Sequence, residues 1–308
     1  MTLQVFIDGA AGTTGLEIRE RLARRADVAL VELDAARRKD PAARREALND
    51  ARMVILCLPD DAARDSMAMI TSARTRVIDA SSAHRVADGW TYGFPELDPG
   101  QAAAISEARL VANPGCYPTG FLALVRPLVR AGLLPPDYPA VVNAVSGYSG
   151  GGKTMIADYE HGAGSSARAY ALGLAHKHVP EMQKHAGLAH PPIFLPSVAG
   201  TYRGMIVEVP VALYALPGRP TLAQCDAALR DSYQGSAIVS VASGEAAMVT
   251  IEDDAGTDRL TVRVCGNERT GQARLIATLD NLGKGAAGAA VQNLNIMAGF
   301  DPVAGLTL

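Results

Sequence analysis

Short apolar runs alternate with amphipathic stretches through the first third of the chain. Each apolar run is bounded by polar or turn-forming residues, as buried β-strands are, and the stretches between the runs have the composition of helices. Strands that alternate with helices build a parallel sheet. The sequence therefore predicts an α/β domain. The predicted strands are 5–7, 28–33, 53–58 and 76–80, and the predicted helices are 16–23, 42–49 and 62–70.

The pattern changes after residue 115, where strand-like runs follow one another with fewer helices between them. Such an order predicts a second, α+β domain with a mixed or antiparallel sheet. An apolar stretch that begins at Phe121 predicts a helix as far as Pro127, where the missing N–H disturbs it. The predicted strands of this domain are 140–145, 204–214, 248–251 and 259–265.

A further helix is predicted within 280–298, because Val291, Leu294 and Met297 fall on one face of it. The chain contains no low-complexity linker, so the domain boundary rests on the change of pattern alone. We predict one domain formed by 1–115 together with the C-terminal helix at about 284–308, and a second domain formed by 116–283.

The first predicted strand runs directly into a glycine-rich segment. Gly9 allows a sharp turn, Gly12 allows the backbone to approach a pyrophosphate, and Gly15 allows helix and strand to pack closely. The helix that begins at Leu16 presents free N–H groups to the phosphates. A purely structural turn is the alternative to this Rossmann-type dinucleotide site. The predicted cofactor contacts in the loop are Gly9, Ala11, Gly12, Thr13, Thr14 and Gly15.

The end of the second predicted strand decides which nicotinamide cofactor binds. An acidic residue there recognises the ribose hydroxyls of NAD, whereas basic residues hold the 2′-phosphate of NADP. The sequence has both, with Glu32 and Asp34 followed by a basic run at 37–39. We favour NADP, with Arg37 and Arg38 as the phosphate contacts. The alternative is that the basic run is only solvated.

Cys116 is the candidate nucleophile among four cysteines. It follows a Pro-Gly turn and precedes a predicted helix, whose N-terminus stabilises a thiolate. Cys57 lies in a predicted apolar strand, and Cys225 and Cys265 have no catalytic residues beside them, so these three are interpreted as structural. The cysteines show neither disulfide nor metal-ligand spacing, so no metal site is predicted.

A thiolate needs a partner that handles protons, and histidine has the pKa for it. Of six histidines, only His176 and His178 lie together with a carboxylate close by, at Glu181. We predict that His178 is the acid and base and that Glu181 orients it, with His176 as the alternative. His84 remains a possible pocket residue. The other three, His161, His185 and His190, are expected to be solvated loop residues.

The glycine-rich segment 146–153 follows a predicted strand. Its backbone amides and Lys153 are predicted to hold an anionic group of the substrate. The segment also matches the spacing of a nucleotide P-loop, but a second phosphate motif beside a dinucleotide fold is the less economical interpretation.

The overall charge points to a small-molecule substrate. The net charge is −3, from 32 acidic and 29 basic side chains, so no strong field favours nucleic acid or a membrane surface. The first residues lack the features of a signal peptide, and we expect a cytoplasmic protein.

Together these segments resemble the shorter type of the N-acetyl-gamma-glutamyl-phosphate reductase family, across nearly the whole chain. The resemblance rests on the glycine loop, 79–85, 92–97, 113–120, 146–153, 176–181 and 284–293. It implies an NADP-dependent enzyme of arginine biosynthesis, with a fold like that of aspartate-semialdehyde dehydrogenase and a homo-oligomer, dimer or tetramer, built through the second domain. The residue roles that it implies are Cys116 and the 176/178 histidine pair in catalysis, Arg85, Tyr148 and Lys153 at the substrate, and Ser81 and Asn293 at the cofactor.

The implied reaction agrees with the residues. Cys116 would attack the acyl phosphate and form a thioester, NADPH would reduce it, and His178 would protonate the resulting oxyanion and then take the proton back. Two other functions remain as alternatives. One is another acyl-phosphate reductase of the same fold, such as aspartate-semialdehyde dehydrogenase, and the other is a non-catalytic NADP-binding regulator.

Overall fold

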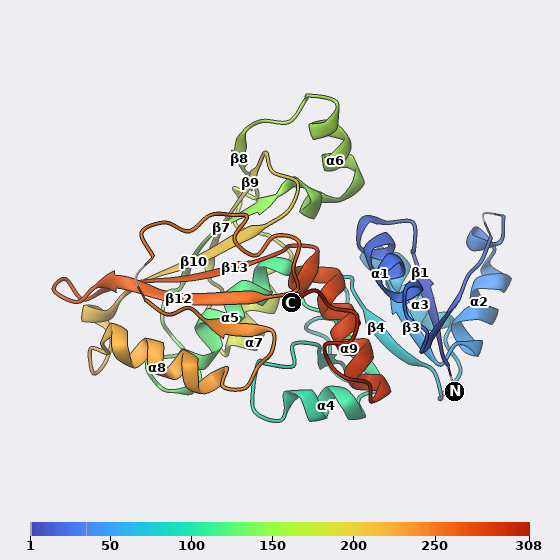
Figure 1. Ribbon diagram of the computed structural model, residues 1–308, viewed down its shortest axis with the longest axis horizontal. Coiled ribbons are helices and arrows are strands. Elements are labelled where there is room, and N and C mark those ends of the chain that lie inside the picture. The colour runs from blue at the N-terminus through green and yellow to red at the C-terminus, as the bar shows by residue number, and fades with distance from the viewer. Residues whose placement is uncertain (1, 35, 245) are drawn as a thin grey trace. The chain divides into compact units, whose positions relative to one another are not determined.

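The computed structural model describes residues 2–34, 36–244 and 246–308, and the chain divides into two compact units, which are labelled by element in Figure 1. Among the described residues, no helix has the length and apolar character that crossing a membrane requires. Unit 1 comprises Met1–Pro95, Gly100–Pro114 and Ala286–Leu306, and unit 2 comprises Glu96–Pro99, Gly115–Gly285 and Thr307–Leu308.

Unit 1 is built on a sheet of six parallel strands in the order β2-β1-β3-β4-β6-β5. This confirms the predicted Rossmann-type domain. Its elements are β1 (Leu3–Asp8), α1 (Thr13–Ala23), β2 (Val28–Val31), a 3-10 helix (Arg37–Lys39), α2 (Pro41–Asp50), β3 (Met53–Leu56), α3 (Asp60–Met69), β4 (Arg76–Asp79), β5 (Thr91–Tyr92), α4 (Gln101–Glu107) and β6 (Leu110–Ala112).

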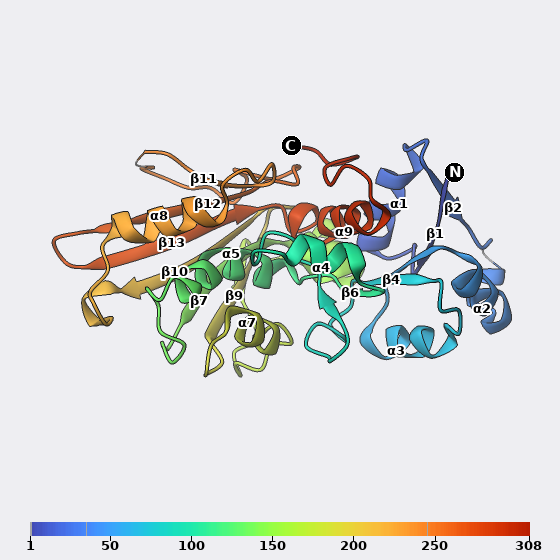
Figure 2. The same cartoon turned by 90° about the horizontal axis from the view of Figure 1, so that it is seen from below.

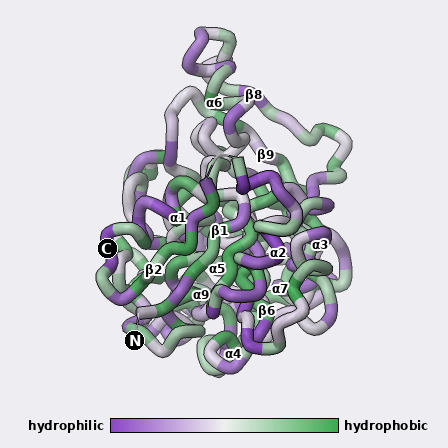
Figure 3. Tube along the Cα trace, turned by 90° about the vertical axis from the view of Figure 1, so that its right-hand side faces the viewer, coloured by the Kyte–Doolittle hydropathy of each residue, from purple (hydrophilic) through white to green (hydrophobic). Residues whose placement is uncertain are grey.

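Both faces of this sheet are covered by helices. Side chains alternate between the two faces along each strand, so neighbouring residues of one strand pack in different cores. Val5 and Ile7 of β1 pack in one core with Leu294, whereas Phe6 packs in another with Leu48. Figure 3 shows the hydrophobic colour along β1 and β2. The strands therefore read as continuous apolar runs rather than as alternating ones.

The C-terminal helix belongs to unit 1 by its contacts. A π-helix at Gly283–Ala287 leads into α9 at Gly288–Ala298, which ends at Gly299 in a left-handed conformation. The helix that Val291, Leu294 and Met297 predicted is therefore present, and residues 288–297 are buried on all of its sides. The helix also stops at Ala298 rather than near 308, because glycine in this conformation caps it.

Unit 2 contains a sheet of seven strands in the order β11-β12-β13-β10-β7-β9-β8. The sheet is mixed, which is one of the two forms that the sequence predicted. β10 runs antiparallel to β13 and β7, and β7 runs parallel to β9. The strands are β7 (Val141–Gly147), β8 (Ala167–Ala169), β9 (Ile193–Ala199), β10 (Met205–Ala212), β11 (Val239–Val241), β12 (Leu260–Asn267) and β13 (Gln272–Leu279).

Helices cover one face of this sheet, with α5 packed on β10 and β13, and α8 on β12 (Figure 2). Residues at every second position of β10, from Met205 to Val211, are buried, and those between them are more accessible. The helical elements are α5 (Cys116–Arg130), α6 (Gly152–Glu160), α7 (Val179–Ala186), α8 (Leu222–Ser232) and 3-10 helices at Tyr148–Gly151 and Leu213–Ala215.

Several local predictions differ from the structure. The helix α1 begins at Thr13 rather than at Leu16, and α5 continues through Pro127 to Arg130. No strand forms at 248–251, where Met248 is 78% exposed, so its apolar character does not reflect burial. His185 lies in α7 rather than in a loop.

Candidate active site

Cys116 is the first residue of α5 and is partly accessible. Gly115 before it has an extended backbone, so the first turn of α5, whose N–H groups have no carbonyl partner within the helix, begins at Cys116 itself. Their partial positive charge favours a thiolate at this place. Almost all of α5 from Tyr117 to Leu128 is buried, which fixes the position of the sulfur on a rigid element.

The two candidate histidines lie together just before α7. Their ring centroids are 4.6 Å apart, and the backbone N–H of His178 donates to Nδ1 of His176 at 3.1 Å. Neutral His176 therefore carries its proton on Nε2. The ring of Tyr117, the residue after Cys116, lies 6.0 Å from the ring of His178 and 6.3 Å from that of His176. The structure thus brings both histidines to the start of α5.

Glu181 is buried in the first turn of α7, and its Oε1 accepts a hydrogen bond from the N–H of Gly115 at 2.8 Å. This contact holds the turn that precedes Cys116. The sequence did not indicate it, because Gly115 and Glu181 are far apart in the chain. The orientation of His178 by Glu181 remains a prediction.

A pair of tyrosine hydroxyls forms another part of the site. The hydroxyl of Tyr170 donates to that of Tyr117 at 3.2 Å, and Tyr117 donates to the carbonyl of Ser197 at 3.1 Å. Burial raises the pKa of Tyr170 to about 12 and that of Tyr117 well above its usual value, and the charge of Cys116 adds to both shifts. Both hydroxyls therefore stay protonated near neutral pH, close to the sulfur.

Gly285 packs against Cys116, since a Cβ at position 285 would lie 2.9 Å from the Cβ of Cys116. Its N–H donates to the carbonyl of Asp280 at 3.0 Å. The neighbouring Lys284 is buried and forms an ion pair of 2.7 Å with Glu96. A backbone without a side chain at 285 is therefore what gives Cys116 its space.

The segment 146–153 differs from its predicted role in one respect. The N–H groups of Gly147, Tyr148 and Ser149 donate to backbone carbonyls of the turn 201–204, so these three amides are already engaged and the prediction that they hold an anion is wrong. The exposed Lys153 is in α6, and the ring of Tyr148 stacks on that of Tyr159 at 4.5 Å.

The turn 201–204 brings a further cation to this region. Nε of Arg203 lies 3.4 Å from Oδ2 of the buried Asp280. Asn281 links the two segments, because it donates to the hydroxyl of Ser149 and accepts from the N–H of Gly204. Arg203 was not predicted, since only the fold places it beside the glycine-rich segment.

Two of the other three cysteines, Cys57 and Cys225, are inert because of their surroundings. Burial raises the pKa of Cys57 to about 12, with the charges of Asp79 and Asp8 adding to the shift, and it raises that of Cys225 to about 11. Both therefore remain thiols near neutral pH, as the structural interpretation of them requires.

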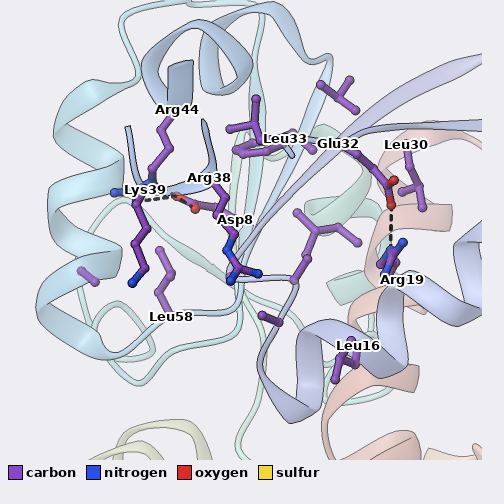
Figure 4. A pocket seen from close by; sticks show the side chains of 17 residues that line it. Asp8, Leu16, Arg19, Leu30, Glu32, Leu33, Arg38, Lys39, Arg44 and Leu58 are labelled. Atoms are coloured by element: carbon purple, nitrogen blue, oxygen red, sulfur yellow. Dashed lines mark hydrogen bonds and ion pairs between the residues drawn. The ribbon is translucent and has the colours of Figure 1, made fainter. Parts of the chain in front are cut away.

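Unit 1 contains a cavity of about 660 Å³ at the carboxyl end of β1, shown in Figure 4. Gly9 has a φ of +90°, and a Cβ there would overlap the carbonyl oxygen of Cys57. Gly15 lies in the first turn of α1, where a Cβ would come within 2.5 Å of the carbonyl oxygen of Gly9. The loop therefore has the tight turn and the close packing of helix and strand that a dinucleotide site needs.

Basic residues line this cavity at the end of β2. Arg38, Lys39 and Arg44 are among the lining residues, together with Arg19. Arg37 is not among them and instead forms an ion pair of 3.2 Å with Glu46. Of the two predicted phosphate contacts, the structure places only Arg38 in the cavity.

Both units match semialdehyde dehydrogenase family models, the NAD-binding domain over residues 4–105 and the dimerisation domain over residues 116–281. A reductase named for N-acetyl-gamma-glutamyl phosphate in Chelativorans sp. is 52% identical, over 96% of this chain and 98% of that protein. One from Pseudomonas putida is 50% identical and covers 96% of each chain. The chain belongs to the N-acetyl-gamma-glutamyl-phosphate reductase family. The resemblance found in the sequence is thereby confirmed.

Solved structures of aspartate-semialdehyde dehydrogenases share the fold of this family member. The probable enzyme from Pseudomonas aeruginosa has a TM-score of 0.73 at 16% identity, covering 97% of this chain and 99% of that one. The enzyme from Candida albicans, solved with NADP, has a TM-score of 0.65 at 13% identity, with the same coverage. At such identities the likeness shows the fold alone.

Three residues that the reductase family resemblance assigned to ligands are buried within unit 1. Asn293 is fully buried and donates to the carbonyl of Gly93 and to Oδ1 of Asn113. The hydroxyl of Ser81 donates to Asp79 at 2.7 Å. The guanidinium of Arg85 donates to the carbonyls of Asn113 and Ala80. In these contacts the three side chains hold the loops at the carboxyl ends of β4 and β6.

His84 lies beside this group. Its Nδ1 is 2.6 Å from Oδ2 of the buried Asp79, and its ring stacks on that of Trp90 at 4.2 Å. The imidazole is thus fixed in position on unit 1, and it is not among the residues that line the cavity there. Its role as a pocket residue stays a prediction.

Proposed function

We propose that this chain reduces N-acetyl-gamma-glutamyl phosphate to N-acetyl-glutamate semialdehyde with NADPH and releases phosphate, as a step of arginine biosynthesis. The observation that carries this proposal is the cluster at the start of α5, where two histidines lie around the residue that follows Cys116, in a member of this reductase family. A cysteine at a helix N-terminus beside an acid-base group is what thioester chemistry needs.

The cavity of unit 1 fits NADP. Its glycine loop lets a pyrophosphate approach the backbone at the start of α1, and its cationic lining suits a further phosphate. We assign the pyrophosphate to the loop from Gly9 to Gly15, with Ala11, Thr13 and Thr14 as contacts, and the 2′-phosphate to Arg38. When bound, NADPH supplies a hydride to the thioester carbon.

Cys116 opens the reaction. Its thiolate attacks the acyl carbon, the bond from that carbon to the phosphate oxygen breaks, and phosphate leaves with the electron pair. The product is a thioester on Cys116. The partial positive charge at the N-terminus of α5 lowers the free energy of the thiolate. The absence of a side chain at Gly285 keeps the side chain of Cys116 uncrowded.

His178 handles the proton in the second half of the reaction. Reduction of the thioester places negative charge on the former carbonyl oxygen, and His178 protonates it. The imidazole then takes the proton back as the C–S bond breaks, so that the aldehyde leaves and the thiolate is restored. His176 accepts the backbone N–H of His178 through Nδ1 and so orients this segment.

The substrate carries a carboxylate and a phosphate, and the region around 146–153 offers cations for them. We assign Lys153 as a cation and the hydroxyl of Tyr148 as a hydrogen-bond donor to these groups, as the resemblance implied. We add Arg203 as a second cation because its guanidinium lies beside the same segment. Arg85, held by two carbonyls of unit 1, is assigned to the substrate only from the resemblance.

For the assembly we propose a homo-oligomer, dimer or tetramer, in the cytoplasm, with 1–115 and 284–308 binding NADP and 116–283 providing catalysis and subunit contacts. Ile193 and Leu195 support it, because each is 45% exposed on the accessible face of β9, in the part of the chain that matches a dimerisation domain.

The test is the reverse reaction, since the acyl phosphate is unstable. With N-acetyl-glutamate semialdehyde, phosphate and NADP, we expect reduction of NADP, and much less with aspartate semialdehyde. Cys116→Ser should lose turnover by orders of magnitude while still binding NADPH. Preference for aspartate semialdehyde would replace this function with that of the related dehydrogenase.

A further inference from the structure

Glu32 occupies the position from which an acidic residue selects NAD. It is the first residue after β2, at the twentieth position beyond Gly12 of the glycine loop, and it lines the cavity of unit 1. In dinucleotide-binding folds a carboxylate at this position hydrogen-bonds the ribose hydroxyls of NAD and repels the 2′-phosphate of NADP. Taken alone, Glu32 would therefore favour NADH.

Arg19 engages this carboxylate. Its Nε lies 2.7 Å from Oε1 of Glu32, and Arg19 lines the same cavity from the side of α1 (Figure 4). The two side chains are 48% and 56% exposed, so the pair lies where a ligand can reach it. The guanidinium neutralises the charge of Glu32 and occupies one of the oxygens that would accept from a ribose.

The remaining charges of the cavity favour a phosphate. Asp8 compensates Arg44, because Oδ2 of Asp8 accepts from Nη2 of Arg44 at 2.7 Å and from the hydroxyl of Ser66 at 2.8 Å. Among the described residues, Arg38 and Lys39 form no ion pair, and Figure 4 shows their side chains extending the same way. Asp8 and Glu32, the two acidic residues of the lining, are each paired with an arginine, so Arg38 and Lys39 give the cavity a net positive charge.

We propose that Arg19 is a specificity-determining residue, which selects NADPH over NADH by neutralising Glu32. The inference rests on the proposed function, because it assumes that this cavity holds the adenosine end of the dinucleotide. If Arg19 is removed, the carboxylate of Glu32 becomes free to accept from the ribose hydroxyls and faces the 2′-phosphate with its full charge.

The test compares dissociation constants of NADPH and NADH by titration calorimetry in four proteins, namely wild type, Arg19→Gln, Glu32→Gln and the double variant. For Arg19→Gln we expect weaker binding of NADPH, tighter binding of NADH and a change of about tenfold in their ratio, since a carboxylate repels a phosphate dianion at a few ångströms. In the double variant the preference for NADPH should return to within about twofold of wild type.

A matched control is Arg64→Gln. Arg64 forms an exposed ion pair with Asp61 on α3, with an N–O distance of 2.9 Å, and lies outside the cavity lining. This variant should bind both dinucleotides as wild type does.

Two results would overturn the inference. One is an unchanged ratio in Arg19→Gln. The other is a loss of NADPH binding in Arg19→Gln that the added Glu32→Gln change does not repair, which would mean that Arg19 contacts the phosphate directly. Because the readout is binding, a wild type that prefers NADPH but fails to reduce the acyl phosphate would refute the proposed function and leave this inference standing.

Discussion

Glu181 accepts a hydrogen bond from the backbone N–H of Gly115, with 2.8 Å between nitrogen and oxygen, and both groups are buried. The bond ties the first turn of α7 to the turn that precedes Cys116. A buried carboxylate that accepts from a backbone N–H fixes that backbone strongly, because such charge-assisted bonds are short and roughly twice as strong as neutral ones. This contact therefore ties the backbone before the candidate nucleophile to the helix that follows the two histidines.

Glu181→Leu should destabilise the protein by about 1–3 kcal/mol, because the N–H of Gly115 would be buried without an acceptor. Glu181→Gln keeps an oxygen in place and should retain most of the stability. Denaturant unfolding of the three proteins measures this difference. A Glu181→Leu variant as stable as wild type would contradict the role given to this contact.

The same Glu181→Gln variant decides whether Glu181 also orients His178. If the carboxylate stabilises the imidazolium, its loss lowers the apparent pKa in the pH profile of kcat. We expect this fall, because Glu181 and His178 lie within one turn of the same segment. An unchanged profile would contradict the prediction that Glu181 orients His178.

Gly285→Ala should reduce kcat by at least about tenfold and cost about 1–3 kcal/mol of stability, because the added methyl would lie 2.9 Å from the Cβ of Cys116 and displace it. Gly200→Ala is the control, since a Cβ there meets neighbours at ordinary distances of 3.5 Å or more. Turnover and denaturant unfolding should separate the two variants. If Gly285→Ala kept the turnover and the stability of Gly200→Ala, the missing side chain at position 285 would not be needed for the position of Cys116.

Tyr170 should ionise at about pH 12 in the folded protein, compared with the ordinary value of 10.0. A group whose folded pKa is raised binds its proton more tightly when folded, so stability is lost as pH rises from about 10 towards 12. The ultraviolet titration of wild type minus that of Tyr170→Phe isolates the group. An ionisation near 10 in this difference would show that the hydroxyl is not buried beside Tyr117.

Alkylation should distinguish the cysteines. At pH 8 in the native protein, iodoacetamide should modify Cys116 much faster than Cys57 and Cys225, because burial raises the pKa of these two to about 12 and about 11. Mass spectrometry of the peptides over time gives the three rates. Modification of Cys57 as fast as that of Cys116 would contradict the assignment of the reactive thiol.

The parallel sheet and the position of Cys116 at a helix start were accessible from the sequence, because both depend on local signals. Strands of unit 1 are buried on both faces and read as apolar runs, and the Pro-Gly turn marks where α5 begins. The wrong strand at 248–251 shows the limit of this signal, since Met248 is apolar yet exposed.

Contacts made by distant segments were not accessible in this way. Nothing near Gly285 in the sequence indicates that it packs on Cys116, and Arg203 approaches Asp280 only because a turn beside β10 meets the end of β13. The backbone amides of 147–149 looked free for an anion, but the turn 201–204 uses them. Arg37 likewise pairs with Glu46, which a run of basic residues does not reveal.

The central claim, a thioester on Cys116, has a direct measurement. When the protein is mixed with NADP and N-acetyl-glutamate semialdehyde in the absence of phosphate, the aldehyde should be oxidised once per site. We predict a burst of NADPH equal to the number of active sites, an acyl group on the peptide that contains Cys116, and no burst in Cys116→Ser. A burst that survives in Cys116→Ser, or an acyl group on another residue, would contradict the account.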